Sequence, residues 1–251
     1  MRVAVVQHRI RTHERMDLAA MLALSERASE EGAQVMVYPA VPGLAASATL
    51  MPAFMHNVEE RAPGMTIVSA YGASNRSGPP MAVPTVLGRT VVLAGDDCID
   101  PELFPQVRAQ ECEALVWQFD AEDDLQAEAC LELALEATLT LAPLVVVVSV
   151  VGSERGIDVH GTSAIVHLGE ILAEGGEGED LLIADVPASS KAPEHGKRLP
   201  EPAPILRQRL RITSLRGERP SFAVRKLEPF ISFGVFRSRC LGMVKPSVLH
   251  S

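Results

Sequence analysis

The chain has 251 residues, of which 47% are hydrophobic and 22% are charged, and its formal net charge is −9 at pH 7. This composition is typical of a globular protein with a sizeable core, and one α/β domain of this length is common, so a second domain is not required. The longest apolar run, Leu141 to Val151, contains Pro143 and is too short to span a bilayer, so we expect no membrane partner.

The sequence favours a cytoplasmic protein. Its first residues, Met1 to Gln7, contain one basic residue and too short an apolar run for a secretory signal. Its four cysteines show no paired spacing of the kind that binds a metal, so we expect reduced thiols. These cysteines are Cys98, Cys112, Cys130 and Cys240.

Charge is distributed unevenly along the chain. Residues 186–251 hold 13 of the 23 basic residues but 4 of the 32 acidic ones, which leaves 10 basic and 28 acidic residues in the rest. The basic segment has no aromatic residues interleaved with its arginines in the way that base stacking requires, so nucleic acid is not the expected partner. We expect this tail to pack on the acidic body of its own subunit or of a partner subunit.

In chain order, the hydrophobic pattern predicts strands alternating with helices. The predicted strands are Arg2 to Gln7, Gln34 to Pro39, Met65 to Val68, Val91 to Ala94, Ala114 to Gln118, Leu144 to Ser149, Thr162 to His167, Glu170 to Ala173 and Asp180 to Val186. The predicted helices are Asp17 to Glu31, Pro101 to Cys112 and Asp123 to Thr138. Residues 44–80 show little pattern, and the tail offers one further apolar piece, Phe230 to Phe236.

The stretch from Gly88 to Glu102 is the centre of this pattern. A short β-branched run ends at Gly95, acidic residues follow at Asp96 and Asp97, and Pro101 is a suitable helix start. In many α/β enzymes such a strand–turn–helix junction carries the nucleophile.

Six blocks of the sequence, in order, resemble the carbon–nitrogen hydrolase (nitrilase/amidase) superfamily. The blocks are residues 2–7, 32–40 (GAQVMVYPA), 88–102 (GRTVVLAGDDCIDPE), 111–116, 145–152 and 161–173 (GTSAIVHLGEILA). The resemblance implies an α-β-β-α sandwich over residues 1–187 with a shortened middle, followed by the basic tail of residues 188–251. It also implies a homodimer formed through helix-covered faces and exchanged C-terminal tails.

The chemistry of that family needs a cysteine nucleophile, a glutamate base and a lysine beside the oxyanion. The glutamate position, directly after Tyr38-Pro39, holds Ala40. The cysteine position holds Gly95, and the first lysine of the chain is Lys191, far beyond it. A further acidic position of the family aligns with Thr140. The sequence therefore predicts no catalytic residues at the family positions.

One alternative alignment makes Cys98 the nucleophile, at the cost of an insertion after Asp100 and a deletion before Cys112. The acidic residues beside Cys98 would raise the pKa of its thiol, which opposes nucleophilic attack. Two functions stay open: a binding or scaffold protein that pairs with itself, a small ligand or an active homologue, and an amidase-type hydrolase that uses Cys98. A weaker third possibility is an anion or nucleic-acid binder that uses the arginines of the tail.

We expect neither a metal nor a cofactor. Asp96, Asp97, Asp100 and Glu102 have the oxygen ligands that a divalent cation prefers, but such a run is more often a solvated turn. The glycines from Gly175 to Gly178 lack the following lysine of a phosphate-binding loop. His160, before the predicted hairpin, and His167, at its turn, are expected at the surface.

Overall fold

The computed structural model describes residues 1–11, 14–39, 50–69, 80–100, 102–154 and 157–187. Some sequence-based expectations therefore lie outside the described residues. These are the surroundings of Ala40, the role of most of the segment after it, and the packing of the basic tail of residues 188–251 with its apolar piece.

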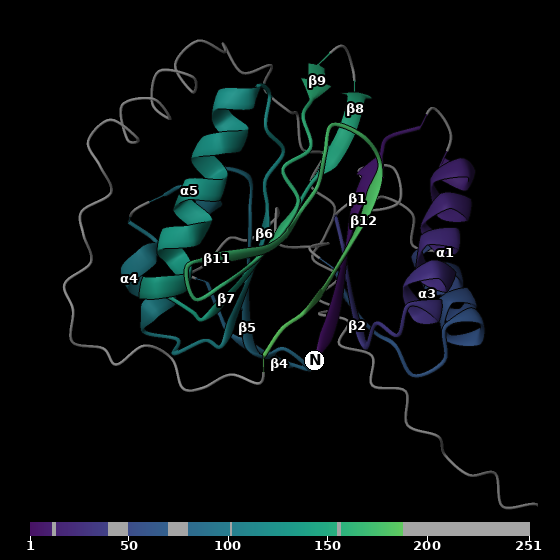
Figure 1. The fold of residues 1–251 in the computed structure, drawn as a ribbon, viewed down its shortest axis with the longest axis horizontal. Coiled ribbons are helices and arrows are strands. Elements are labelled where there is room, and N and C mark those ends of the chain that lie inside the picture. Colours follow the sequence, from purple (N-terminus) through teal and green to yellow (C-terminus); the bar gives the residue numbers. More distant parts are fainter. Residues whose placement is uncertain (12–13, 40–49, 70–79, 101, 155–156, 188–251) are drawn as a thin grey trace, which may run out of the picture.

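In the described part of the chain, two six-stranded sheets lie face to face (Figure 1). The first has the order β3-β2-β1-β8-β9, with β12 also paired to β1, and the second has the order β11-β10-β7-β6-β5-β4. The first sheet consists of β1 (Arg2–Arg9), β2 (Val35–Tyr38), β3 (Thr66–Ser69), β8 (Val150–Glu154), β9 (Ile157–Val159) and β12 (Asp180–Asp185). The second consists of β4 (Val83–Thr85), β5 (Gly88–Ala94), β6 (Ala114–Gln118), β7 (Leu144–Val148), β10 (Ala164–His167) and β11 (Glu170–Glu174).

Helices cover the outer face of each sheet, which gives the four layers α-β-β-α (Figure 1). The first sheet is covered by α1 (Glu14–Glu30) and α3 (Leu50–Arg61). The second is covered by α4 (Phe104–Arg108) and α5 (Asp124–Thr140), and the turn η2 (Gly95–Cys98) follows β5. No helix in the described ranges is long and apolar enough to cross a membrane.

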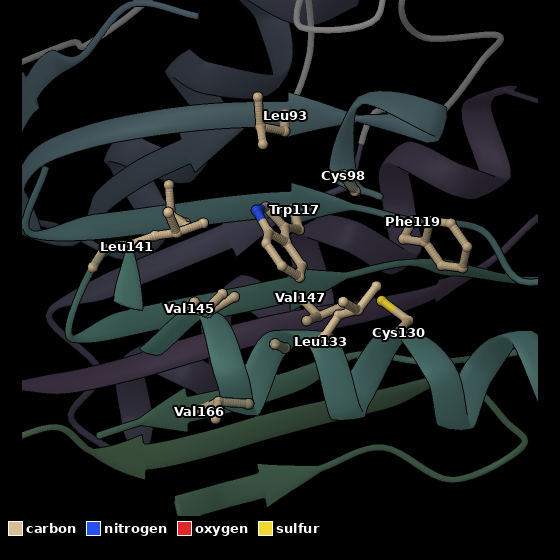
Figure 2. Close-up of a cluster of buried hydrophobic side chains, with 14 of the residues drawn as sticks. Leu93, Cys98, Trp117, Phe119, Cys130, Leu133, Leu141, Val145, Val147 and Val166 are labelled. Atoms are coloured by element: carbon tan, nitrogen blue, oxygen red, sulfur yellow. The ribbon is translucent and has the colours of Figure 1, made fainter. Parts of the chain in front are cut away.

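The alternation of side chains along each strand divides the core into three clusters. On β1, Val3 and Val5 face the second sheet, whereas Ala4 and Val6 face α1 and α3. On β6, Leu115 and Trp117 face α5 instead of the first sheet, and Figure 2 shows Trp117 among the side chains of that outer cluster. Because both faces of the central strands are covered, these strands are apolar throughout, as the sequence pattern indicated.

The structure confirms the predicted sandwich and differs from the sequence-based expectations in several elements. The helix expected from Pro101 to Cys112 is wrong in extent, because α4 ends at Arg108 and Glu111 has a positive φ of 48° that breaks helical geometry. Helix α3 and strands β4, β8 and β9 were not expected. His167 is buried, with 8% of its surface exposed, so its expected surface position is also wrong.

Candidate functional site

The strand–turn junction after β5 is the place where the sequence led us to look for a nucleophile. Gly95 directly follows β5, has a φ of 59° and is exposed. This is the left-handed region that side chains rarely adopt and that nucleophile turns use to hold a side chain clear of the sheet. A Cβ built on Gly95 meets no other heavy atom within 4 Å. The turn thus has the shape and the open space for a projecting side chain, but Gly95 provides none.

Cys98, the alternative nucleophile, is three residues further on and faces the opposite way. Its side chain is fully buried in the cluster beneath α5, and its Sγ lies 3.5 Å from the carbonyl oxygen of Gln118, to which the thiol donates (Figure 2). Burial raises the pKa of this thiol well above its ordinary value, and Cys130 and the carboxylates of Asp97 and Asp120 raise it further. The thiolate that attacks a carbon is therefore strongly disfavoured at Cys98.

Ser149 lies between β7 of the second sheet and β8 of the first, where the carboxyl ends of β7 and β1 come together. The Ser149 hydroxyl accepts a hydrogen bond from the backbone N–H of Thr162 at 2.8 Å, and the Ser163 hydroxyl accepts one from the N–H of Ser149 at 3.0 Å. Nearby, the Asp120 carboxylate accepts from the N–H of Val150 at 3.1 Å. These bonds join the ends of β6 and β7 to the start of β10, and thus fix the edge of the sandwich where Gly95 lies.

Gln7 is the polar residue at the centre of this edge. Its side chain is fully buried, and its Oε1 accepts from the N–H of Ser163 at 3.0 Å. Its Nε2 donates to the carbonyl oxygen of Gly178 at 2.7 Å and to that of Gly176. One amide of β1 therefore holds both the second sheet and the glycine loop that leads into β12.

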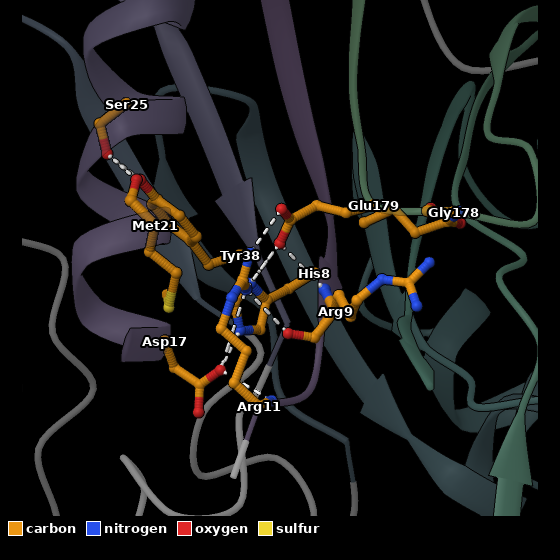
Figure 3. A network of polar contacts seen from close by, with 10 residues as sticks. His8, Arg9, Arg11, Asp17, Met21, Ser25, Tyr38, Gly178 and Glu179 are labelled. Carbon is orange, nitrogen blue, oxygen red and sulfur yellow. Dashed lines mark hydrogen bonds and ion pairs between the residues drawn. The ribbon is translucent and has the colours of Figure 1, made fainter. Parts of the chain in front are cut away.

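His8 and Arg11 form a second polar network, on the α1 side of β1 (Figure 3). His8 Nε2 lies 2.8 Å from Asp17 Oδ1, and its Nδ1 lies 3.3 Å from Glu179 Oε1 without forming a hydrogen bond. Arg11 donates to both oxygens of Glu179, at 2.8 and 2.7 Å, and its N–H donates to Asp17 at 3.1 Å. Since the His8 ring is fully buried and engaged by protein groups, it does not contact solvent and acts in positioning.

The burial of His8 has a consequence for stability. Burial lowers the pKa of His8 below its ordinary 6.5 and outweighs Asp17 and Glu179, which raise it; the charge of Arg11 lowers it further. The unfolded chain therefore takes up its proton at a higher pH than the folded chain does, so acidification favours unfolding. Burial raises the pKa of Glu179, but the hydrogen bonds from Arg11 and Arg9 and the charge of Arg11 outweigh it and lower this pKa below 4.5, outside the range in which His8 titrates.

We expect the free energy of unfolding to be nearly constant around pH 7.5 and to fall as the pH drops below about 6.5, by about 1.4 kcal/mol for each unit by which the folded pKa is lowered. Urea unfolding followed by the emission of Trp117 at pH 7.5 and 5.5 measures this difference. His8→Gln is expected to flatten the profile in part, because His167 is also buried with a lowered pKa. An unchanged slope in His8→Gln would assign the pH dependence to other groups.

Sequence reasoning missed Gln7, His8, Asp17 and Glu179 as a set. The available signal was weak: two polar residues, Gln7 and His8, directly follow a fully apolar run at the end of a predicted strand. In the described ranges, no group of three or more His, Cys, Asp or Glu side chains is arranged to hold a metal ion. The acidic residues after Gly95 therefore do not form such a group with their described neighbours.

The fold is similar to that of solved amidases. A cysteine-to-alanine variant of the Nesterenkonia AN1 amidase, from the nitrilase superfamily, is 21% identical, with a TM-score of 0.58 over 74% of this chain and 90% of that one. The same type of variant in complex with butyramide is 21% identical over 74% of this chain and 91% of that one, with a TM-score of 0.58. A glutamate-to-leucine variant, with an acetamide moiety added at the active-site cysteine, is 20% identical over 84% of this chain and 97% of that one, with a TM-score of 0.59.

No protein-family model matches the chain, and no curated protein sequence matches it. At 20–21% identity, the likeness to the amidases shows the fold. The chain therefore has the α-β-β-α sandwich of the nitrilase-superfamily amidases, as the six sequence blocks implied.

Proposed function

We propose that this chain is a member of the nitrilase superfamily that has lost C–N hydrolysis and acts as a non-catalytic binding or scaffold protein. The observation that carries the proposal is Gly95: the turn after β5 keeps a backbone suited to a projecting nucleophile, but no side chain projects from it. A fold persists without its chemistry because packing and catalysis depend on different residues.

Two further features support the loss of hydrolysis. Residues 1–187 contain no lysine, and the glutamate position of the family is Ala40, whose methyl group cannot take up a proton. The amidase of similar fold, by its description, reacts at an active-site cysteine, whereas Cys98 is buried with a strongly raised thiol pKa. The alternative, an amidase-type hydrolase that uses Cys98, requires this thiol to become exposed and ionised.

The same proposal places the chain in the cytoplasm, as a homodimer or paired with an active homologue. A small molecule that binds to it would be a ligand and not a substrate. The imbalance between the acidic body and the basic tail favours self-association, because opposite charges attract across an interface. Sedimentation velocity at two protein concentrations tests the dimer independently of any activity.

We expect no release of ammonia from butyramide or acetamide and no fluoroacetamide adduct on the folded protein, because no ionised thiol is accessible. Ammonia assays and intact-mass spectrometry measure both, with the Nesterenkonia amidase as the positive control. A matched variant, Gly95→Cys, places a thiol at the exposed turn and is expected to react with iodoacetamide at least about 100-fold faster than Cys98.

Turnover or an adduct that disappears in Cys98→Ala would overturn the proposal and establish the alternative alignment. If Gly95→Cys is alkylated no faster than Cys98, the turn does not present a side chain to solvent, and the backbone at Gly95 is not that of a lost nucleophile position. In either case, the unfolding midpoint of each variant shows whether its fold is intact.

A further inference from the structure

The buried ring of His8 has one nitrogen atom without a hydrogen-bond partner. Its Nδ1 is buried and unpaired in the described part of the chain, and it lies 3.3 Å from Oε1 of Glu179 (Figure 3). A buried polar atom that lacks a partner costs free energy, and native proteins contain few of them. The surroundings of this atom indicate what it can bind.

The contacts of Asp17 determine which ring nitrogen of His8 carries the hydrogen. Asp17 Oδ1 lies 2.8 Å from His8 Nε2, accepts the backbone N–H of Arg11 at 3.1 Å, and lies 4.0 Å from the guanidinium of the same arginine. An oxygen atom that accepts a hydrogen bond beside a positive charge belongs to an ionised carboxylate, which can only accept. The neutral ring therefore donates from Nε2, and Nδ1 holds a lone pair.

The lone pair of His8 Nδ1 faces a second acceptor. Glu179 Oε1 accepts hydrogen bonds from Nη1 of Arg11 at 2.8 Å and from the backbone N–H of Arg9 at 3.2 Å, and its Oε2 accepts one from Nη2 of Arg11 at 2.7 Å. Burial raises the pKa of Glu179, but these bonds and the charge of Arg11 outweigh it, so the carboxylate stays ionised. Two acceptor atoms 3.3 Å apart repel each other, and a hydrogen on Nδ1 would turn this repulsion into attraction.

The charges around the ring favour uptake of this hydrogen, whereas burial opposes it. The site consists of His8 from β1, Asp17 from α1, Arg11 from the segment after β1, and Glu179 from the turn before β12. Two carboxylates and one guanidinium give a net charge of −1 while the ring is neutral, and protonation of the ring cancels it. Tyr38, on the same face of the first sheet, stays neutral because burial raises its pKa, and β8 has no titratable side chain at its positions paired with β1.

The position of Glu179 connects this site to the edge of the sandwich. Glu179 directly follows the glycine-rich loop of residues 175–178. The carbonyl oxygen of Gly178, the preceding residue, accepts a hydrogen bond from Nε2 of Gln7 at 2.7 Å. A movement of the Glu179 carboxylate therefore acts on the loop that Gln7 holds, at the edge where Gly95 lies.

We propose that His8 Nδ1 and Glu179 Oε1 form a proton-binding site that strengthens the link between β1 and the glycine-rich loop when the pH falls. The proton binds to the Nδ1 lone pair, and the Glu179 carboxylate then approaches the ring by about 0.5 Å, to the distance of a hydrogen bond between charged groups. The attraction is local: the fold as a whole still loses stability on acidification, because the unfolded chain binds the proton more tightly. The site does not depend on whether the protein hydrolyses an amide.

Nitrogen NMR of the imidazole rings in the folded, full-length protein tests the assignment of the hydrogens. At pH 7.5 we expect a hydrogen on Nε2 of His8 and a lone pair on its Nδ1. At lower pH we expect hydrogens on both atoms while Trp117 emission is still that of the folded protein. Sequential assignment distinguishes His8 from the other six of the seven histidines. A hydrogen on Nδ1 at pH 7.5, or proton uptake that occurs only together with unfolding, would overturn the proposal.

Glu179→Gln should lower the pH at which His8 takes up its proton. The substitution removes the carboxylate charge, and the new amide can donate to the Nδ1 lone pair, so both changes favour the neutral ring. The matched control is Glu177→Gln, which removes the same charge from an exposed side chain of the same loop and should leave the titration midpoint of His8 unchanged. A midpoint that is unchanged in Glu179→Gln, or that shifts equally in both variants, would contradict a direct contact between His8 and Glu179.

A double-mutant cycle measures the attraction itself. His8→Gln, Glu179→Gln and the double variant are unfolded with urea at pH 7.5 and at a pH below the midpoint found by NMR, and the cycle cancels the separate effect of each substitution. We expect the coupling between the two positions to increase about tenfold in the unfolding equilibrium constant at the lower pH, the low end for a hydrogen bond to a charged group. Equal coupling at both pH values would show that the proton creates no new attraction and would overturn the proposal.

Discussion

Replacing Gly161 by alanine is expected to lower the free energy of unfolding by about 3 kcal/mol, since each of the lost hydrogen bonds is worth about 1 kcal/mol and the displaced groups stay buried. A Cβ at Gly161 would lie 2.3 Å from Nε2 and 2.5 Å from Oε1 of Gln7. The Gln7 amide is fully buried and has to move away from its partners at Ser163 and Gly178. The methyl group thus disrupts the link between the two sheets.

The matched control is Gly176→Ala, in the loop that Gln7 holds. Gly176 has no positive φ, and a Cβ there meets nothing within 4 Å, so this substitution should change stability by less than about 0.5 kcal/mol. Urea unfolding followed by Trp117, the only tryptophan, measures both variants. Similar midpoints for Gly161→Ala and the control would show that the Gln7 amide relaxes without cost.

The sequence was sufficient to predict the elements that are buried on both faces. Strands such as β6 and β7 are continuous apolar runs, and α5 begins after Asp123, whose side chain accepts a hydrogen bond from the N–H of Gln126. Helix α3 was missed because it contains Pro52 and lacks an acidic first turn. Short strands such as β9, with three residues, are formed by pairing with a neighbour, which no local pattern reveals.

The sequence likewise predicts only part of the candidate site. Gly95 and the turn after β5 were predicted from a local pattern of a strand, a glycine and acidic residues. The direction in which Cys98 points was not, because it depends on how α5 packs over the second sheet. The Gln7 network joins residues 169 and 171 positions apart, a relation that a single sequence does not show.

The polar contacts that hold the two sheets together are separate from the turn at Gly95, so the fold can persist without catalytic chemistry. The bonds that fix the carboxyl edge of the sandwich are made by Gln7, Ser149 and Ser163, and none of them involves Gly95. A side chain can therefore be removed at the turn without loss of the contacts that hold the two sheets together. In this architecture, the scaffold of the site and its reactive position are separately replaceable.

The network around His8 is expected to show the second large effect. Asp17→Ala should lower the free energy of unfolding by about 2 to 3 kcal/mol at pH 7.5, since it leaves buried donors without an acceptor. Asp17 lies 2.8 Å from His8 Nε2 and accepts the N–H of Arg11, and the fully buried ring cannot turn to water instead. Asp17 also raises the pKa of His8, so its removal should extend the acid-sensitive range to lower pH and enlarge the loss of stability on acidification.

Asp17→Asn separates hydrogen bonding from charge. The amide oxygen still accepts from His8 Nε2 or from the N–H of Arg11, so this variant should lose about 1 kcal/mol, less than half of the effect of alanine. A loss as large as that of Asp17→Ala would show that the negative charge beside Arg11, rather than the hydrogen bonds, stabilises the junction of β1 and α1. If neither variant changes the unfolding midpoint, Glu179 and Arg11 alone are enough to hold β12 against the end of β1.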